Sequence, residues 1–247
     1  MSDPTRPAVV TGASRGFGRA IATALVAAGT PVVGIARDED RLRTLHDELG
    51  DGFVPVVGDA VDEVLASDVV HRHRPGLLVL NAGAAPAMGP VHEQSWESFA
   101  RAWEVDVRQA FTWIRLALTT PLAPGSLVVA MSSGAALAGS PLSGGYAGAK
   151  ATVRFLARYA ADESTRAGLG IRATALLPQL TPTTDLGAAA ADAYAARAGV
   201  DRETFAAGLA PALTAEQVGK AVVGLASDGD VPATAYRLSA GGLQSLD

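Results

Sequence analysis

The sequence predicts an α/β protein of the doubly wound class, with a mostly parallel seven-stranded sheet and helices on both of its faces. Short runs of apolar and β-branched residues, typical of buried strands, alternate along the 247 residues with longer segments typical of helices. No charge block, Ser/Gly run or proline tract interrupts the alternation. We therefore expect residues 1–247 to form one domain, built on a parallel sheet.

Seven segments have the composition of strands. They are Pro7–Thr11, Pro31–Ala36, Phe53–Val57, Leu77–Leu80, Ser126–Met131, Ile171–Leu177 and, as an edge strand, Ala235–Leu238. Helices are expected over about 19–28, 38–49, 61–73, 95–118, 145–167 and 214–227, and the Ala-rich stretch 183–213 predicts short helices. Ligands of such sheets bind at the carboxyl ends of the strands, so the residues that follow each strand are the first candidates for a site.

The composition argues against several classes of function. The chain has no Cys, which excludes a disulfide scaffold and a cysteine nucleophile and fits a cytoplasmic location. It shows no apolar signal segment and no run of about 18 apolar residues, so no membrane span is expected. The net charge is −5 with scattered basic residues, which argues against nucleic acid as a partner. His71 and His73 lack the acidic or Cys neighbours of a metal site, so no metal is expected.

Tyr146 and Lys150 stand four residues apart in a predicted helix, and Ser133 lies thirteen residues before the tyrosine. Positions i and i+4 share one helix face. A tyrosine ionises near pH ~10, and a neighbouring cation lowers that pKa. The pair is therefore expected to exchange a proton at neutral pH, with Ser133 polarising the same oxygen. Taken alone, such a pair is a weak signal, because it usually lies on a solvated helix face.

A glycine-rich turn joins the first predicted strand to the first predicted helix. Such a turn presents backbone N–H groups at a helix N-terminus, which is a site for a pyrophosphate, although it could also be a purely structural turn. The turn residues expected to contact a dinucleotide are Gly12, Ser14, Arg15, Gly16, Phe17 and Gly18.

Four motifs follow one another along the chain: Thr11-Gly12-x-x-x-Gly16-x-Gly18, Asn81-Ala82-Gly83, Ser133, and Tyr146-x-x-x-Lys150. Their order and spacing resemble those of the short-chain dehydrogenase/reductase family, and the resemblance runs from about Pro7 to Gly242. It implies a one-domain Rossmann-like fold and hydride transfer between NAD(P) and an alcohol or carbonyl. It also implies a homodimer or homotetramer, formed through the helices near 95–118 and 145–167.

The resemblance also implies roles for the catalytic residues. Tyr146 would donate a proton to the carbonyl oxygen, Lys150 would assist it and bind the nicotinamide ribose, and Ser133 would orient the substrate. Ser132 competes for the last role, but the family offset of thirteen residues selects Ser133. The family usually has an Asn as a fourth member, and Asp106 stands in its place. An Asp at this position could preserve the hydrogen bonds of the usual Asn without affecting activity, or it could reduce activity, and both alternatives stay open. Asp106→Asn is expected to retain activity.

The choice of cofactor depends on the end of the second strand. An acidic residue there would bind the ribose 2′-OH of NAD, whereas an Arg would hold the 2′-phosphate of NADP. The chain has Ala36 followed by Arg37, with Arg15 as a second cation, so NADP(H) is expected. A shift of one residue in the alignment would place Asp38 in the acidic role and favour NAD.

Further cofactor contacts are implied after later strands. Asp59, with Ala60 beside it, would meet the adenine, or Asp59 could cap a helix. The residues that would line the adenosine side are Asn81, Ala82 and Gly83. At the nicotinamide end the implied contacts are Pro178 and Thr183, with Thr181 and Thr184 as nearby alternatives to the threonine.

The segments expected to border the substrate, 84–90, 137–145 and the lid implied over 183–213, are mostly small or apolar. A neutral, fairly apolar ketone or alcohol is therefore the expected small-molecule partner. The leading interpretation is an NADPH-dependent carbonyl reductase, with a dinucleotide-binding sensor or scaffold, or a lyase or epimerase on the same fold, as alternatives. The aromatic residues of the helix near 95–118 could serve an oligomer interface or the core. They are Trp96, Phe99, Trp103, Phe111 and Trp113.

Overall fold

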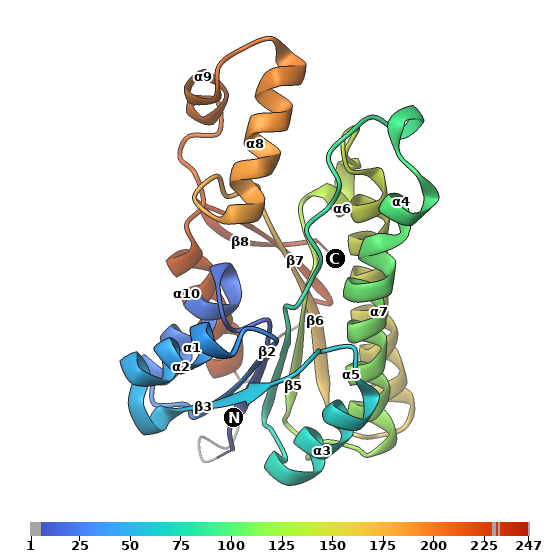
Figure 1. The fold of residues 1–247 in the computed structure, drawn as a ribbon. Helices are drawn as coiled ribbons and strands as arrows, with labels where there is room; N and C mark the ends of the chain where they lie inside the picture. Colours follow the sequence, from blue (N-terminus) through green and yellow to red (C-terminus); the bar gives the residue numbers. More distant parts are fainter. Residues whose placement is uncertain (1–5, 229–230, 232, 247) are drawn as a thin grey trace.

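One eight-stranded sheet forms the centre of the molecule (Figure 1). The computed structural model describes residues 6–228, 231 and 233–246. The strands lie in the order β3-β2-β1-β4-β5-β6-β7-β8. Their bounds are β1 Ala8–Thr11, β2 Val32–Ala36, β3 Phe53–Val57, β4 Leu77–Leu80, β5 Leu127–Met131, β6 Arg172–Pro178, β7 Ala235–Ser239 and β8 Gly242–Ser245.

The predicted doubly wound parallel sheet is confirmed, but the predicted count of seven strands is wrong by one. Strands β1 to β7 pair in parallel, and β8 pairs antiparallel with β7, with Leu243 opposite Leu238. All four residues of β8 are exposed, so this strand lacks the buried apolar run by which the other strands were identified.

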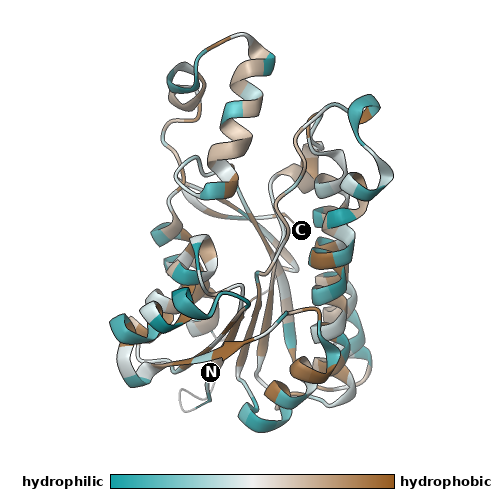
Figure 2. Cartoon of the chain, in the orientation of Figure 1, coloured by the Kyte–Doolittle hydropathy of each residue, from teal (hydrophilic) through white to brown (hydrophobic). Residues whose placement is uncertain are grey.

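Helices cover both faces of the sheet. On one side lie α1 (Gly16–Ala27), α2 (Glu39–Leu49) and α10 (Ala215–Ser227), and on the other lie α3 (Glu63–His73), α5 (Arg108–Thr119) and α7 (Gly144–Arg166) (Figure 1). Figure 2 shows strands that are largely hydrophobic and helices in which hydrophilic and hydrophobic residues are mixed.

Alternating strand residues divide the core into two layers. Val9 and Leu78 pack with the α3–α5–α7 layer, whereas their neighbours Val10 and Val79 pack with the α1–α2–α10 layer. Because successive side chains of a strand point to opposite faces, a strand buried on both faces must be apolar throughout. This explains why the central strands are readable from the sequence.

The helix expected over 95–118 is interrupted. It consists of α4 (Trp96–Ala102), a π-helical turn η3 (Trp103–Val107) and α5. The π turn buries Asp106 beside the sheet. Such a turn keeps the composition of the surrounding helix, so nothing in the apolar spacing marks it, although π turns often occur at functional sites.

The stretch 183–213 forms α8 (Asp185–Ala198) and α9 (Arg202–Ala207), in line with the short helices expected there. This pair stands above the carboxyl ends of the strands, opposite α4 and the short α6 (Ala135–Ala138) (Figure 1). The remaining elements are two short 3₁₀ turns, η1 (Gly50–Gly52) and η2 (Val91–Glu93). In the described part of the chain, every helix is too short or too polar to span a bilayer.

Candidate active site

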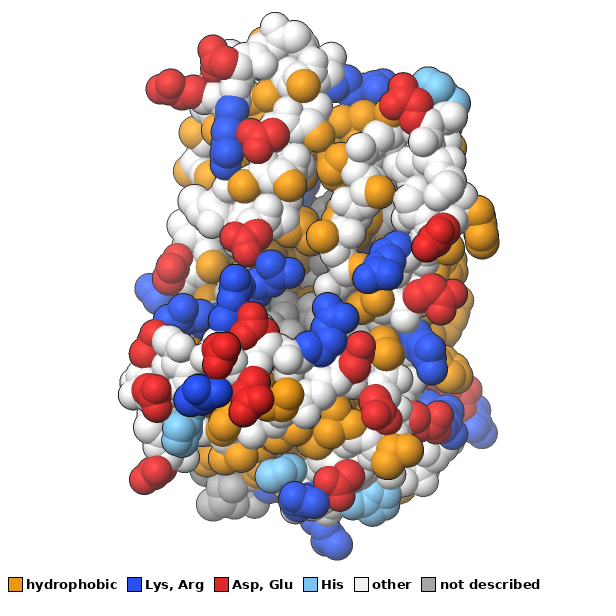
Figure 3. Space-filling view, in the orientation of Figure 1, with side chains coloured by type: hydrophobic (Ala, Val, Ile, Leu, Met, Phe, Trp, Pro, Cys, Tyr) orange, Lys and Arg blue, Asp and Glu red, His pale blue; other side chains and the backbone are white. Residues whose placement is uncertain are grey.

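A cleft of about 540 Å³ opens at the carboxyl ends of the strands. The strand order reverses between β1 and β4, and doubly wound sheets bind ligands at such a reversal. The walls come from the β1–α1 turn, the ends of β2 and β4, η3, α7 and the start of α8. Figure 3 shows basic side chains gathered beside the hollow in the middle of this face.

The glycine turn is held by a contact that only glycine permits. A Cβ on Gly18 would lie 2.1 Å from the carbonyl oxygen of Gly12. Gly12 itself has φ +68°, and a Cβ there would lie 2.9 Å from Cα of Ala82. The predicted turn residues that line the cleft are Gly12, Ser14, Arg15, Gly16 and Phe17. Gly18 is buried, and its lack of a side chain allows the close backbone contact with Gly12.

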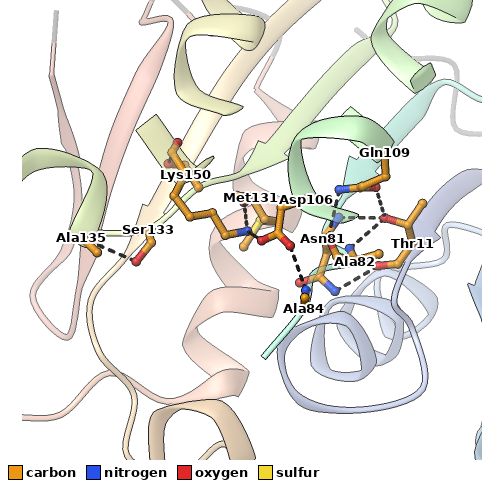
Figure 4. A network of polar contacts seen from close by, with 11 residues as sticks. Thr11, Asn81, Ala82, Ala84, Asp106, Gln109, Met131, Ser133, Ala135 and Lys150 are labelled. Carbon is orange, nitrogen blue, oxygen red and sulfur yellow. Dashed lines mark hydrogen bonds and ion pairs between the residues drawn. The ribbon is translucent and has the colours of Figure 1, made fainter. Parts of the chain in front are cut away.

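A buried polar network fixes the end of β4 against the end of β1 (Figure 4). The hydroxyl of Thr11 accepts from the backbone N–H groups of Asn81 and Ala82 at 2.9 and 3.0 Å. It donates to Oε1 of Gln109 at 3.0 Å, and Nε2 of Gln109 donates to the carbonyl of Ala82 at 3.0 Å. The side chain of Asn81 donates to the carbonyl of Thr11 at 3.0 Å. Gln109 was not predicted, although a Gln on the buried face of an amphipathic helix is a signal that could have found it.

Three arginines line one end of the cleft, each near a carboxylate. Arg37 lies 3.8 Å from Asp59, and Arg15 lies 3.2 Å from Asp185 at the start of α8. The third, Arg41, lies in the first turn of α2 and was missed by the sequence analysis, which considered only Arg15 and the residues at the end of β2.

The side chain of Asp38, the residue that could have favoured NAD, is engaged elsewhere. One of its oxygens accepts from the backbone N–H of Arg41 at 3.0 Å and caps α2, and the other pairs with the Arg41 guanidinium at 3.2 Å. An N-cap carboxylate stabilises its helix, so turning it toward a ribose would carry a cost.

Asp59 and Ala60 both line the cleft after β3. Asp59 accepts from the backbone N–H of Val61 at 3.2 Å, whereas the N-cap of α3 is Asp62. The carbonyl of Ala60 accepts from the indole N–H of Trp113 at 2.9 Å. Asp59 therefore does not cap α3, the other role that its position suggested.

Lys150 and Tyr146 project from α7 into the cleft. Nζ of Lys150 lies 5.6 Å from the centroid of the Tyr146 ring and donates to the carbonyl of Met131 at 2.9 Å. It also lies 2.9 Å from Oδ2 of Asp106, and the two side chains are only 6% and 1% exposed. Burial disfavours the ammonium, but Asp106 and Tyr146 together outweigh it, so the pKa of Lys150 lies above its ordinary value.

Asp106 is held in place from the side opposite the lysine. Its Oδ1 accepts from the backbone N–H of Ala84 at 2.8 Å (Figure 4). Its Oδ2 makes an ion pair with Lys150 rather than an aligned hydrogen bond, and it has no hydrogen-bond partner among the described residues. A Cβ on Gly83 would lie 2.8 Å from Oδ2, so the glycine of the Asn81-Ala82-Gly83 motif leaves room for this carboxylate.

The two candidate serines differ in what their hydroxyls do. Ser132 is buried and donates to the backbone carbonyl of Lys150 at 2.7 Å, which commits its one hydrogen. Oγ of Ser133 accepts from the backbone N–H of Ala135 at 3.2 Å, which leaves its hydrogen available to another acceptor. Among the described residues of the cleft wall is Ser132 and not Ser133, so the role of Ser133 in substrate binding stays a prediction that rests on its available hydrogen.

The structure does not bring every predicted residue to the cleft. Pro178 ends β6 in a buried position, Thr183 is exposed, and neither is among the described residues of the cleft wall. Thr184, weighed as an alternative to Thr183, does line the cleft, and its Oγ1 caps α8 by accepting from Gly187 at 3.1 Å. At this end Thr184 is the better placed of the two threonines.

A polar contact joins α8 to the start of α7, the helix that carries Tyr146 and Lys150. The hydroxyl of Tyr194 on α8 hydrogen-bonds Ser140, and Ser140 hydrogen-bonds Ser143, just before α7, at 2.6 Å. The ring of Tyr194 stacks on Phe205 of α9 at 6.1 Å. This contact joins residues 54 positions apart, and no spacing in the sequence indicates it.

Comparisons with known proteins agree with this geometry. A family model described as enoyl-(acyl carrier protein) reductase matches residues 12–239. A probable NADP-dependent dehydrogenase of Haemophilus influenzae is 34% identical over 191 residues, which cover 73% of each chain. An uncharacterized short-chain type dehydrogenase/reductase of Sinorhizobium fredii is 34% identical over 173 residues, or 69% of this chain and 68% of that protein.

The fold also matches a solved structure, that of a 3-ketoacyl-(acyl-carrier-protein) reductase from Brucella melitensis complexed with NADH. The TM-score is 0.79 at 23% identity, with 96% of this chain and 97% of that one covered, and at this identity the likeness concerns the fold alone. The family model, in contrast, spans the chain from the glycine turn to the end of β7, including Tyr146 and Lys150. The chain belongs to the short-chain dehydrogenase/reductase family, as its motifs predicted.

Proposed function

We propose that the protein interconverts a ketone and a secondary alcohol with NADP(H), working chiefly as an NADPH-dependent reductase of a fairly apolar small molecule. Membership of the family makes it an oxidoreductase that uses a nicotinamide dinucleotide. The observation that carries the proposal is that Tyr146 and Lys150 line the same cleft as the glycine turn. A proton donor and a dinucleotide cradle thus share one cavity.

The residues present fit a dinucleotide. Gly12 and Gly18 let the backbone approach closely, and the turn stands at the N-terminus of α1, where N–H groups favour a diphosphate. Arg15, Arg37 and Arg41 gather at one end of the cleft and would hold a 2′-phosphate. The NADP dependence stated for the Haemophilus influenzae relative supports the same choice.

The proposed chemistry divides among a few side chains. When bound, the nicotinamide supplies or accepts the hydride. Tyr146 gives its phenolic proton to the carbonyl oxygen and takes it back in the reverse direction. Ser133 donates its hydroxyl hydrogen to the same oxygen and stabilises the charge that develops there. Lys150 donates to the carbonyl of Met131, forms an ion pair with Asp106, and would bind the nicotinamide ribose.

The wall near the reacting centre supports an apolar substrate. Six cleft residues from positions 84–88 and from α8 are small or apolar, whereas Asn81, just after β4, and Asp185, the first residue of α8, are polar: the six are Ala84, Ala85, Pro86, Met88, Leu186 and Ala189. Such walls bind through surface burial and leave orientation to a few polar groups. We therefore infer a neutral ketone, oriented by Tyr146 and Ser133, as the substrate class.

The test is cofactor titration followed by turnover. Quenching of tryptophan fluorescence measures binding, and NADPH should bind more tightly than NADH. NADPH should also be oxidised when at least one ketone of an apolar panel is added. Tyr146→Phe should keep NADPH binding and lose turnover by at least about 100-fold, because it removes only the proton donor. Binding of NADPH without turnover on the whole panel would instead favour a dinucleotide-binding sensor.

We also propose that a second copy of the chain covers the outer faces of α4, η3, α5 and α7. Trp113 lies in the core, whereas Trp96, Trp103 and Phe111 are exposed, as are the stacked Phe155 and Tyr159 of α7. Such aromatic patches are typical of interfaces. Sedimentation equilibrium should give a dimer or tetramer, and a monomer at micromolar concentration would contradict this.

Two broader expectations complete the proposal. One sheet takes strands from Ala8 to Ser245, which supports a single domain. The lack of Cys supports a cytoplasmic location. Limited proteolysis, and fractionation of the source cells, would test these two statements.

A further inference from the structure

The contact between Asp106 and Lys150 is the least ordinary feature of the cleft. Two opposite charges lie 2.9 Å apart with 1% and 6% of their side chains exposed. In the family resemblance the position of Asp106 usually holds an Asn, which carries no charge. The carboxylate is seated by the N–H of Ala84 and by the space that Gly83 leaves for it. The chain therefore builds a defined place for a charge that the reaction scheme above does not require.

We propose that Asp106 is a positioning residue: its carboxylate holds Lys150 in the cleft as a fixed ammonium by direct contact, and this contact sets the alkaline limit of catalysis. The inference rests on the proposed function for its catalytic consequence. Its structural part, the charge state of Lys150, stands on the ion pair alone.

The physical argument compares what surrounds the ammonium with and without the carboxylate. The groups that face Lys150 are the Asp106 carboxylate from η3, Tyr146 from its own helix and the neutral carbonyl of Met131 from β5. Burial favours the uncharged amine, and Asp106 is the stronger of the two titratable groups that oppose it. With a neutral amide at position 106, burial would be opposed by Tyr146 alone. The ammonium would then lose its proton at a lower pH.

The direction of the effect follows from the sign of the shift. With Asp106 present, the pKa of Lys150 lies above its ordinary value, so the charge persists through the neutral and mildly alkaline range. In Asp106→Asn the charge should be lost as the pH rises through a lower value. The alkaline limb of the pH profile, relative to the rate of the same variant at pH 7, should therefore move to lower pH.

The chain offers a direct measurement, because it contains two lysines, Lys150 and Lys220. Lys220 is exposed and serves as an internal reference. Protein labelled with ¹³C at lysine Cε should show two resonances whose shifts report each amine as the pH is raised. In the unmodified protein Lys150 should titrate above the ordinary value of a lysine side chain, about 10.4. In Asp106→Asn it should titrate at least about 1 pH unit below its position in the unmodified protein.

Glu104→Gln is the matched control, because Glu104 lies in the same π turn but is exposed. It removes an equal charge two residues away and should leave the Lys150 titration unchanged. The proposal is overturned if Lys150 titrates at or below the ordinary lysine value in the unmodified protein, a result that needs no variant to fold. It is also overturned if the Lys150 resonance titrates at the same pH in Asp106→Asn as in Glu104→Gln.

The catalytic part is read separately, from ketone reduction across pH with NADPH. The alkaline limb should fall at a lower pH in Asp106→Asn than in Glu104→Gln when each profile is normalised to its own rate at pH 7. If no ketone supports turnover, the proposed function fails while the lysine resonances still decide the role of Asp106. If turnover exists but the limb does not move, the catalytic consequence is wrong.

Discussion

The cleft contains two kinds of ion pair, and they differ chiefly in burial. Asp106 and Lys150 meet in the floor of the site, almost entirely removed from solvent. At the opposite end, Arg15 pairs with Asp185 and Arg37 with Asp59, with side chains between 45% and 75% exposed. Each pair joins a basic side chain to an aspartate carboxylate, but water competes for the exposed pairs and not for the buried one.

The difference indicates which contacts can be exchanged. An exposed pair is worth about 0–1 kcal/mol, so its arginine can leave the carboxylate for a phosphate at little cost. A buried pair cannot be opened without leaving an unpaired charge in a poorly solvated place. The arginines are therefore suited to a ligand that arrives and leaves, and Lys150 is suited to a contact that persists through turnover.

The largest expected effect comes from opening the buried pair. Lys150→Met should lower the free energy of unfolding by about 3–5 kcal/mol, because the Asp106 carboxylate is left buried without its cation. Urea denaturation measures the change. Lys220→Met, at an exposed lysine, is the control and should change stability little. Equal losses in the two variants would contradict the contrast between buried and exposed charges.

Arg37→Ala should weaken binding of NADPH by about 10- to 100-fold, because one charge-assisted contact to a phosphate is worth about 1.5–3 kcal/mol. Binding of NADH, which lacks the 2′-phosphate, should change little. Fluorescence titration with both cofactors measures the difference. Arg43→Ala removes an arginine of the same helix region that pairs with Glu39 and Asp40 and does not line the cleft. A loss of NADPH affinity as large in Arg43→Ala would show that general charge, not position, is responsible.

The smallest expected effect is a gain. Asp185→Asn should tighten NADPH binding by about fivefold or less, because it releases Arg15 from an exposed pair and removes a negative charge from the cleft mouth. The gain should shrink at high salt. Asp192→Asn removes an exposed charge of the same helix, one that pairs with Arg202 outside the cleft, and should have no effect. Weaker NADPH binding in Asp185→Asn would mean that Asp185 supports the cofactor rather than competing with it.

Much of this architecture could be predicted because its causes are local. Strands buried on both faces need continuous apolar runs, and the glycine turn needs residues that tolerate a 2.1 Å approach to a Cβ position. The places of Arg41 and Tyr194 depend instead on which elements meet in space. The π turn at Asp106 and the exposed strand β8 were missed because neither alters the apolar spacing. The sequence could thus identify Asp106 as a departure but not its direct contact with Lys150.

The π turn between α4 and α5 has a geometric consequence of its own. Each residue of an α-helix advances the side-chain direction by about 100° around the axis. A wider turn therefore changes the direction in which all later side chains of the helix point. On one side of η3, Trp96 faces outward, and on the other Trp113 fills the core. Removing one residue from 103–107 to restore a regular helix would change the orientation of α4 side chains relative to α5 side chains. Either Trp96 or Trp113 would then leave its present environment, and Asp106 would turn away from Lys150. The π turn thus separates two helical segments with different orientations of their side chains, and it carries Asp106 between an exposed Trp96 and a buried Trp113.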